Sequence, residues 1–446
     1  MSDGARPNVL FILADDLGWG DVGYHGSYIL TPTIDRLARN GLEIDRHYVC
    51  PVCTPTRASL LTGRYPARFG RRATFPSNDP VLPDGCPTLA TLFRDAGYAT
   101  GLFGKWHLGS TPATGPNAFG FGAAYGSLAG GVDPYTHRYK TGPFSRTWHR
   151  NGELVDEPGH ATDLITSEAT RWIAGRAEPW FCYVPFTAVH QPVMAPEAWI
   201  DRYAGRINGT DPLLARAQEV YGAYTSQMDH GIGLLLDAVK ATPGGLHDTI
   251  VVFASDNGAP MGERHSTDVD LYPGYHENLP NAGSNGPLRG MKSTLYEGGI
   301  RTPAALLWQG HVAPGRLESP IGVADWMPTF AEMLGAPADP RWDGRSVWGL
   351  FNGTAEAELR TLHWNKLHRE FAILRGDWKL VVDRKAGTCE LFNLACDPYE
   401  RDDRAAAEPA LAAELEALID ENHRGDGVDE RPLAPAAPRQ SAAGDP

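Results

Sequence analysis

The sequence predicts an α/β protein with a large, mostly parallel or mixed central sheet flanked by helices, followed by a smaller C-terminal α+β subdomain. Apolar runs rich in β-branched and aromatic residues recur up to about residue 254, as in strands that are buried on both faces. Helical patterns lie between these runs, which favours a parallel sheet. After about residue 355 the runs become shorter and are separated by tight turns. We therefore expect a large α/β domain over 1–355 and a subdomain with a small antiparallel sheet over 356–446.

Four of the predicted strands end next to residues that can do chemistry. These strands are 9–13, 98–103, 180–186 and 249–254. The residues that follow them are Asp15 and Asp16, Lys105 and His107, His190, and Asp256 and Asn257, respectively. Ligands of open α/β sheets bind beyond the carboxyl ends of the strands. The sequence therefore predicts that these side chains meet in one site.

The remaining segments are predicted from periodicity and from residues that begin or end elements. Helices are expected over 33–40, 88–96, 163–174 and 215–240. Segment 258–287 is rich in Gly, Pro, Asn and His and predicts a long loop, a kind of segment that is often functional. In the C-terminal part we expect strands over 371–374, 378–383 and 388–392, a helix over 404–419, and a loosely ordered tail from about residue 427.

The composition argues against several classes of function. The chain of 446 residues carries a formal charge of −14, which disfavours nucleic acid and anionic membrane surfaces as partners. Six cysteines in a chain of this length do not form a disulfide framework. The first apolar run is too short for a secretory signal, and no run approaches the ~20 residues of a membrane span. We therefore expect a cytoplasmic protein that does not bind membranes; its oligomeric state does not follow from the sequence.

Cys53 precedes a predicted short helix, with Thr54 as the N-cap, Pro55 at the first helical position and Gly63 after the end. Free N–H groups and the helix dipole favour anions there, so we expect a lowered thiol pKa and an anion-binding role that includes Arg57. Two other interpretations compete. A Cys-x-x-Cys pair with Cys50 is disfavoured because no second pair completes a zinc site. A buried structural cysteine remains open on local sequence alone.

Asp15, Asp16, Asp256 and Asn257 form an all-oxygen set that suits a hard cation such as Ca²⁺, with Mg²⁺ as the alternative. Each pair alone is more often a turn or a helix cap. Both pairs together, each at the end of a buried strand, favour a metal site.

The segment Cys53-Thr-Pro-Thr-Arg57, followed by Leu61-Thr-Gly-Arg64, resembles the signature of type I sulfatases in the alkaline phosphatase superfamily. Thr56 stands where Ser is usual, and it keeps the hydroxyl. Four further segments resemble family motifs in the same order: 8–21, 104–109, 188–192 and 287–303, with 256–258 as the second metal segment. Segments 148–153 and 162–166 favour the branch that contains arylsulfatases and carbohydrate sulfatases.

The resemblance implies a sulfuric ester hydrolase that cleaves aryl or carbohydrate sulfates. A formylglycine-generating enzyme would oxidise Cys53 to formylglycine, and the aldehyde hydrate, a gem-diol, would attack sulfur. Residue 53 would also contact the metal together with Asp15, Asp16, Asp256 and Asn257. The resemblance assigns charge stabilisation to Arg57, Lys105 and Lys292, protonation of the leaving alcohol to His190, and product release to His107. Lys292 taken alone is most often a solvated surface lysine.

Two other functions remain open. A phosphonate or phosphate ester hydrolase of the same superfamily carries a similar Cys motif but tends to place His among the metal ligands, where this chain has Asn257. A catalytically silent metal-binding protein would keep the fold without the reaction. The natural substrate does not follow from the sequence. Loops 126–138 and 258–287 are expected to line the mouth of the pocket, with His265, His276 and Arg289 as candidate substrate contacts.

Overall fold

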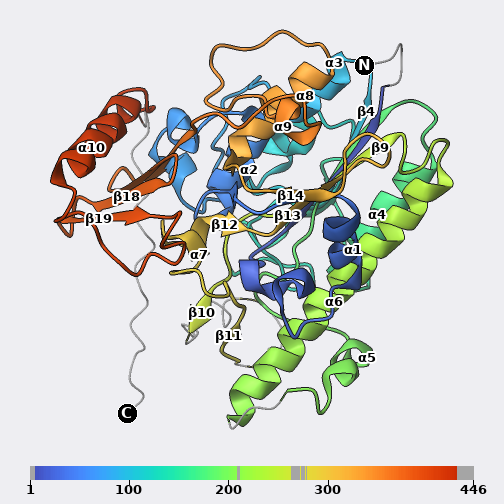
Figure 1. Cartoon of the computed structure of the whole chain (residues 1–446). Helices are drawn as coiled ribbons and strands as arrows, with labels where there is room; N and C mark the ends of the chain where they lie inside the picture. Colours follow the sequence, from blue (N-terminus) through green and yellow to red (C-terminus); the bar gives the residue numbers. More distant parts are fainter. Residues whose placement is uncertain (1–5, 208–210, 263–271, 273–276, 278, 429–446) are drawn as a thin grey trace.

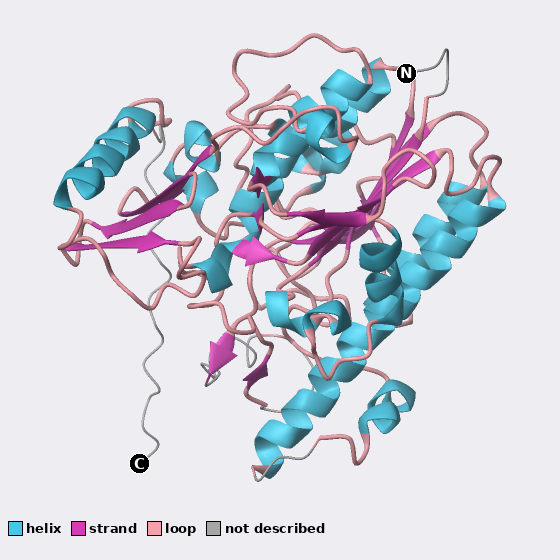
Figure 2. Ribbon diagram, viewed as in Figure 1, coloured by secondary structure: helices cyan, strands magenta, loops and turns pink. Residues whose placement is uncertain are grey.

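The computed structural model describes residues 6–207, 211–262, 272, 277 and 279–428. Its centre is a ten-stranded sheet with helices on both faces (Figures 1 and 2). In spatial order its strands are β14 (Gly315–Leu317), β2 (Leu42–Ile44), β13 (Ala304–Leu307), β9 (Thr249–Ser255), β1 (Asn8–Ala14), β8 (Trp180–Pro185), β4 (Ala99–Lys105), β5 (Ala123–Ser127), β6 (Trp148–Arg150) and β7 (Glu153–Leu154).

The five strands β9-β1-β8-β4-β5 pair in parallel, whereas β13, β6 and β7 pair antiparallel with their neighbours. The sheet is therefore mixed with a parallel centre, which confirms the predicted α/β class. The four strands predicted from apolar runs are β1, β4, β8 and β9. All four belong to the parallel centre, so their carboxyl ends point to one edge of the sheet.

Alternation along the strands divides the core into two layers. Val9, Phe11 and Leu13 of β1 face one hydrophobic cluster, and Leu10 and Ile12 face the other. The first layer is completed by α2 (Cys53–Thr62), α3 (Leu89–Asp95), α8 (Trp326–Met333) and α9 (Trp348–Phe351). The second is completed by α1 (Pro32–Asn40), α4 (Ala161–Ala174) and the long α6 (Pro212–Ala241). Close to α6 lies the short α5 (Glu197–Ile200). None of the described helices is long and apolar enough to cross a bilayer.

The C-terminal subdomain has a four-stranded antiparallel sheet, β16 (Thr361–Lys366), β17 (Glu370–Arg375), β18 (Trp378–Asp383) and β19 (Thr388–Asn393), covered by α10 (Pro409–His423). It lies beside the central sheet, at the left of Figure 1. The first of the four strands was not predicted. The helix begins at Pro409 and not at Arg404, since Arg404 instead donates its N–H to Leu391 O.

Short elements connect the central sheet to the C-terminal subdomain. A three-stranded sheet joins β12 (Arg301–Thr302), β3 (His47–Tyr48) and β15 (Ile321–Gly322), and α7 (Glu297–Ile300) directly precedes β12. The predicted long loop contains the two-residue strands β10 (Met261–Gly262) and β11 (Asn281–Ala282).

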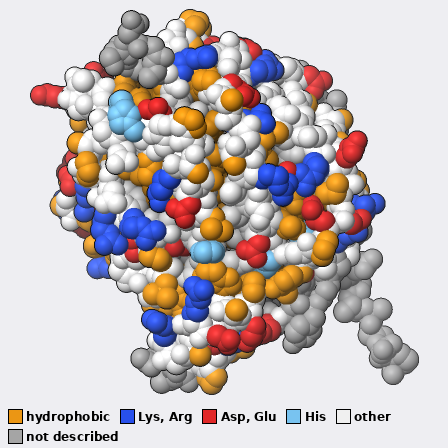
Figure 3. Space-filling model, turned by 90° about the vertical axis from the view of Figure 1, so that its right-hand side faces the viewer, with side chains coloured by type: hydrophobic (Ala, Val, Ile, Leu, Met, Phe, Trp, Pro, Cys, Tyr) orange, Lys and Arg blue, Asp and Glu red, His pale blue; other side chains and the backbone are white. Residues whose placement is uncertain are grey.

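On the face shown in Figure 3, acidic, basic and apolar side chains of the described residues are interspersed.

Candidate active site

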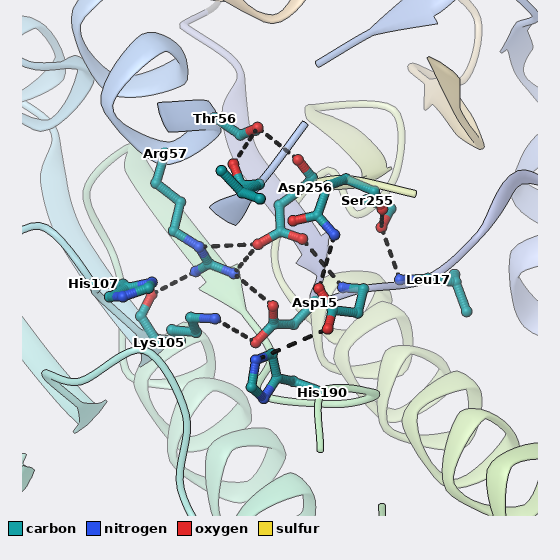
Figure 4. Close-up of polar contacts among 12 residues, drawn as sticks. Asp15, Leu17, Thr56, Arg57, Lys105, His107, His190, Ser255 and Asp256 are labelled. Carbon is teal, nitrogen blue, oxygen red and sulfur yellow. Dashed lines mark hydrogen bonds and ion pairs between the residues drawn. The ribbon is translucent and has the colours of Figure 1, made fainter. Parts of the chain in front are cut away.

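The predicted site residues meet at the carboxyl edge of the parallel strands (Figure 4). Asp15 and Asp16 follow β1, and Asp256 and Asn257 follow β9, with both pairs fully or nearly fully buried. Lys105 is the last residue of β4, and His107 follows two residues later. Burying this many charges is costly unless each is paired.

Each carboxylate of the site has its own cation. Lys105 Nζ lies 2.7 Å from Asp15 Oδ2, Arg57 Nη2 lies 2.7 Å from Asp256 Oδ2, and Lys292 Nζ lies 2.6 Å from Asp16 Oδ1. Three carboxylates therefore face three cations, and the formal charge of this set is zero when all six groups are ionised. A divalent cation would give the set an excess of two positive charges, as recognition of an anionic group requires.

Two buried oxygens of the site lack a hydrogen-bond partner among the described residues: Asp15 Oδ1 and Asn257 Oδ1. Ligand atoms of Asp15, Cys53 and Asp256 lie within 4.8 Å of one another. Unpartnered buried oxygens are rare and need an explanation, and a hard cation would supply the missing partner. The donor set therefore fits the predicted metal. Asp16 is not among these three; its carboxylate accepts hydrogen bonds from Lys292 and Asn257.

Burial and pairing move the pKa values of the carboxylates in opposite directions. Burial raises the pKa of Asp15 to about 8, against the lowering effect of Lys105. For Asp16, burial alone raises the pKa, but Lys292, together with Lys105, outweighs burial and holds the pKa below its usual range. In turn, Asp16 raises the pKa of Lys292 despite burial, so this lysine keeps its proton.

Cys53 differs from its prediction in two ways. It is itself the first residue of α2, with Val52 as the N-cap, whereas Thr54 uses its hydroxyl to donate to His107 O. The pKa of the Cys53 thiol is raised and not lowered, because burial outweighs Lys105 and Lys292. The unmodified cysteine is therefore a protonated thiol in this structure.

Thr56 connects the Cys53 turn to the strand end that carries Asp256. Its hydroxyl lies 2.6 Å from Asp256 O, to which it donates, and 3.0 Å from Cys50 N, from which it accepts. Both contacts need a hydroxyl, which Thr and Ser share. Arg57 donates to Asp256 from Nε and Nη2 and to Lys105 O from Nη1, so all three of its nitrogens are engaged below the pocket.

A cavity of about 500 Å³ opens above these groups. Cys53, Asp16, His107, His190 and Lys292 line its floor, so five predicted residues face one space. The predicted loops contribute Gly130, Pro260, Met261, Tyr272 and Asn281. Several lining residues were not predicted, because polar residues in loops carry no pattern: Ser77, Asn78, Tyr139, Lys140 and Gln191.

The two histidines of the floor are held differently. His107 has a left-handed backbone (φ 59°) and its Nδ1 has no hydrogen-bond partner among the described residues. His190 is held by a hydrogen bond from Nδ1 to Gln191 O at 2.6 Å, and its Nε2 lies 3.9 Å from Asp16. Burial and the nearby cations lower both pKa values well below that of free histidine. Both rings are therefore neutral at neutral pH.

One candidate substrate contact was wrong. Arg289 pairs with Glu390 and donates to Glu400 O, and its guanidinium stacks on Tyr296 and Phe392. It faces the C-terminal sheet and does not line the cavity, because a planar guanidinium is stabilised by aromatic faces and a carboxylate there. His265 and His276 lie outside the described residues.

Comparisons with known proteins identify the family to which the sequence is similar. A family model described as sulfatase matches residues 7–336. Arylsulfatase J of Mus musculus is 29% identical over 92% of this chain and 75% of its own length. N-acetylgalactosamine-6-sulfatase of Homo sapiens is 32% identical over 76% of this chain and 65% of its own length.

Solved structures give the same result for the fold. A protein named Ps i-CgsB, solved in complex with k-i-k-neocarrahexaose, aligns with a TM-score of 0.82 and 29% identity over 95% of this chain and 94% of its own. The phosphonate monoester hydrolase of Agrobacterium radiobacter aligns with a TM-score of 0.63 and 20% identity over 94% of this chain and 96% of its own, which shows a shared fold.

Proposed function

The chain belongs to the sulfatase family and is a sulfatase, and from this premise we propose that it hydrolyses sulfate monoesters with a nucleophile made from Cys53. One observation carries the proposal. Cys53 lies in one cluster with Asp15 and Asp256, and on the floor of a cavity with His107, His190 and Lys292. We propose that a formylglycine-generating enzyme converts Cys53 and that Ca²⁺, or Mg²⁺, binds beside it.

The metal would be held by Asp15, Asp16, Asp256, Asn257 and residue 53. When bound, it would supply a fixed positive charge that lowers the pKa of the hydrated aldehyde and polarises the sulfuryl group. Asp256 and Asp15 keep their orientation through Arg57 and Lys105, which contact them at 2.7 Å each. These two cations also contribute positive potential beneath the sulfate, although their donors are engaged with protein.

Lys292 faces the cavity and keeps its proton, so it can bind a sulfuryl oxygen and the leaving oxygen. His190 lies on the same side and is held by the Gln191 carbonyl. An anionic substrate beside His190 favours its protonated form, which allows it to donate to the leaving alcohol. His107 is neutral and has an unused nitrogen, so it suits the role of the base that accepts a proton when sulfate is released.

The cavity above the floor is large enough for a ring in addition to the sulfate group, since its volume is about 500 Å³. Its lining mixes amides and aromatic side chains such as Asn78, Gln191 and Tyr139. Such a lining suits an aryl or carbohydrate sulfate, the classes named in the related proteins.

The test compares a chromogenic aryl sulfate with the matching aryl phosphate. Protein produced together with a formylglycine-generating enzyme should cleave the sulfate much faster, and Cys53→Ala should abolish this turnover. Faster phosphate cleavage would favour the phosphonate or phosphate ester hydrolase. Failure of a fully converted protein to cleave any aryl or sugar sulfate would favour a silent metal-binding protein.

A further inference from the structure

The segment that carries Lys292 has little regular structure of its own. Lys292 N donates to Ala259 O and Ser293 N donates to Pro51 O. Ser293 has φ 73°, a left-handed conformation that a serine adopts only where its surroundings hold it. The position of the Lys292 side chain is therefore set by contacts from outside the segment.

One outside contact comes from β16 of the C-terminal sheet. Lys366 Nζ donates to Ser293 O at 2.6 Å and lies 2.9 Å from Glu370 Oε2. The side chain of Lys366 is only 17% exposed. It therefore holds the peptide between Ser293 and Thr294, one residue beyond Lys292.

A second contact comes from β18 and is wholly buried. Lys379 Nζ lies 2.9 Å from Glu297 Oε1 and 2.8 Å from Glu400 Oε1, and the side chains of all three are essentially unexposed. Glu400 Oε2 also accepts the backbone N–H of Glu297 at 2.7 Å. This buried set fixes Glu297, the first residue of α7.

The backbone of α7 connects the two sides of the site. Gly298 N donates to Arg289 O at 2.7 Å, near the start of the Lys292 segment. Gly299 O accepts from Gly258 N at 3.1 Å, directly after Asn257. A Cβ on Gly258 would lie 1.8 Å from Gly298 O, so the two backbones are in close contact. A shift of α7 would therefore move the Lys292 segment.

We propose that Lys366 and Lys379 of the C-terminal sheet are positioning residues for Lys292. Lys366 acts on Ser293 and Lys379 acts through Glu297. The C-terminal subdomain is then part of the catalytic apparatus without touching the substrate. This inference rests on the proposed function, which gives Lys292 its role at the sulfate.

The experiment is a double-mutant cycle on aryl sulfate turnover, with each variant corrected for its formylglycine content. Lys366→Met and Lys379→Met are measured in the parent protein and in a Lys292→Ala background. The control is Lys385→Met, an exposed lysine in the turn after β18. Each test variant should lower kcat/KM by about tenfold in the parent, below the roughly 100-fold loss that a 1 Å misplacement causes. In the Lys292→Ala background each should cost less than about twofold, because coupled residues are not additive.

The outcomes separate this inference from the proposed function. Equal losses in both backgrounds would mean a merely structural role and would overturn the inference alone. Full sulfate turnover by Lys292→Ala would overturn the assigned role of Lys292 and this inference with it. If Lys379→Met does not fold, Glu400→Gln replaces it. Burial raises the pKa of Glu400 to about 7, so its neutral form is already accessible in the fold.

Discussion

Replacing Arg57 by Met should lower the free energy of unfolding, an effect that can be measured without any assay of catalysis. Arg57 is fully buried and makes three hydrogen bonds, two to Asp256 and one to Lys105 O. Its removal leaves a buried carboxylate without its cation, which costs about 3–5 kcal/mol. With an unfolding entropy of about 2.1 cal/mol/K per residue, 446 residues give about 0.9 kcal/mol/K, so the Tm should fall by about 3–5 °C in a single transition.

The assay is calorimetric unfolding in the presence of a chelator, on a Cys53→Ala background so that conversion of the cysteine does not vary. The matched control is Arg39→Met, since Arg39 is 69% exposed and lies 3.9 Å from Asp35. An exposed pair contributes about 0–1 kcal/mol, so this Tm should change by about 1 °C or less. Adding Asp256→Asn to Arg57→Met should recover part of the loss. A Tm for Arg57→Met no lower than that of Arg39→Met would refute the reasoning.

Three further predictions concern the metal and the two histidines. Ca²⁺ at about 100 times its Kd should stabilise the Cys53→Ala protein by about 2.7 kcal/mol in a thermal shift experiment. Asp256→Asn should abolish this shift in Tm. An unchanged shift in the Asp256→Asn protein would contradict the metal site. Gly130→Ala should lower kcat about 10- to 100-fold, because the new Cβ would lie 2.3 Å from His107 Nε2. The control Gly175→Ala should keep its kcat, because its Cβ meets nothing closer than 3.6 Å. Equal kcat values for the two variants would contradict the packing argument. In rapid-mixing experiments, His107→Ala should release about one equivalent of alcohol and then turn over slowly, because the base is needed only when sulfate is released. His190→Ala should show a slow first turnover. The same time course for both variants would contradict their separate roles.

The fold and most of the floor of the site could be predicted because both depend on local patterns. Strands buried on both faces are continuous apolar runs, and the residues directly after them must lie at one edge of a parallel sheet. This brought Asp15, Lys105, His190 and Asp256 together from segments up to about 240 residues apart. Strand β16 was missed because its sequence, Thr361–Lys366, contains His, Asn and Lys at its half-buried positions.

What the sequence could not give depends on tertiary contacts. The thiol of Cys53 was expected to ionise more easily because a helix N-terminus is visible in the sequence, whereas the burial that raises its pKa is not. Arg289 was a candidate substrate contact, but its partner Glu390 is 101 residues away and could not be identified from the sequence. The same holds for Lys379 and Glu297, which are 82 residues apart. Such pairs carry no sequence periodicity.

The most direct test of the central claim is to measure how sulfate turnover depends on the chemical state of residue 53. The tryptic peptide 47–57 contains Cys53 and reports by mass the fraction that is converted to formylglycine. Protein made with increasing amounts of a formylglycine-generating enzyme should show kcat in direct proportion to this fraction, with no turnover at zero conversion. Turnover that is independent of the converted fraction would contradict the account, because the nucleophile would then lie elsewhere.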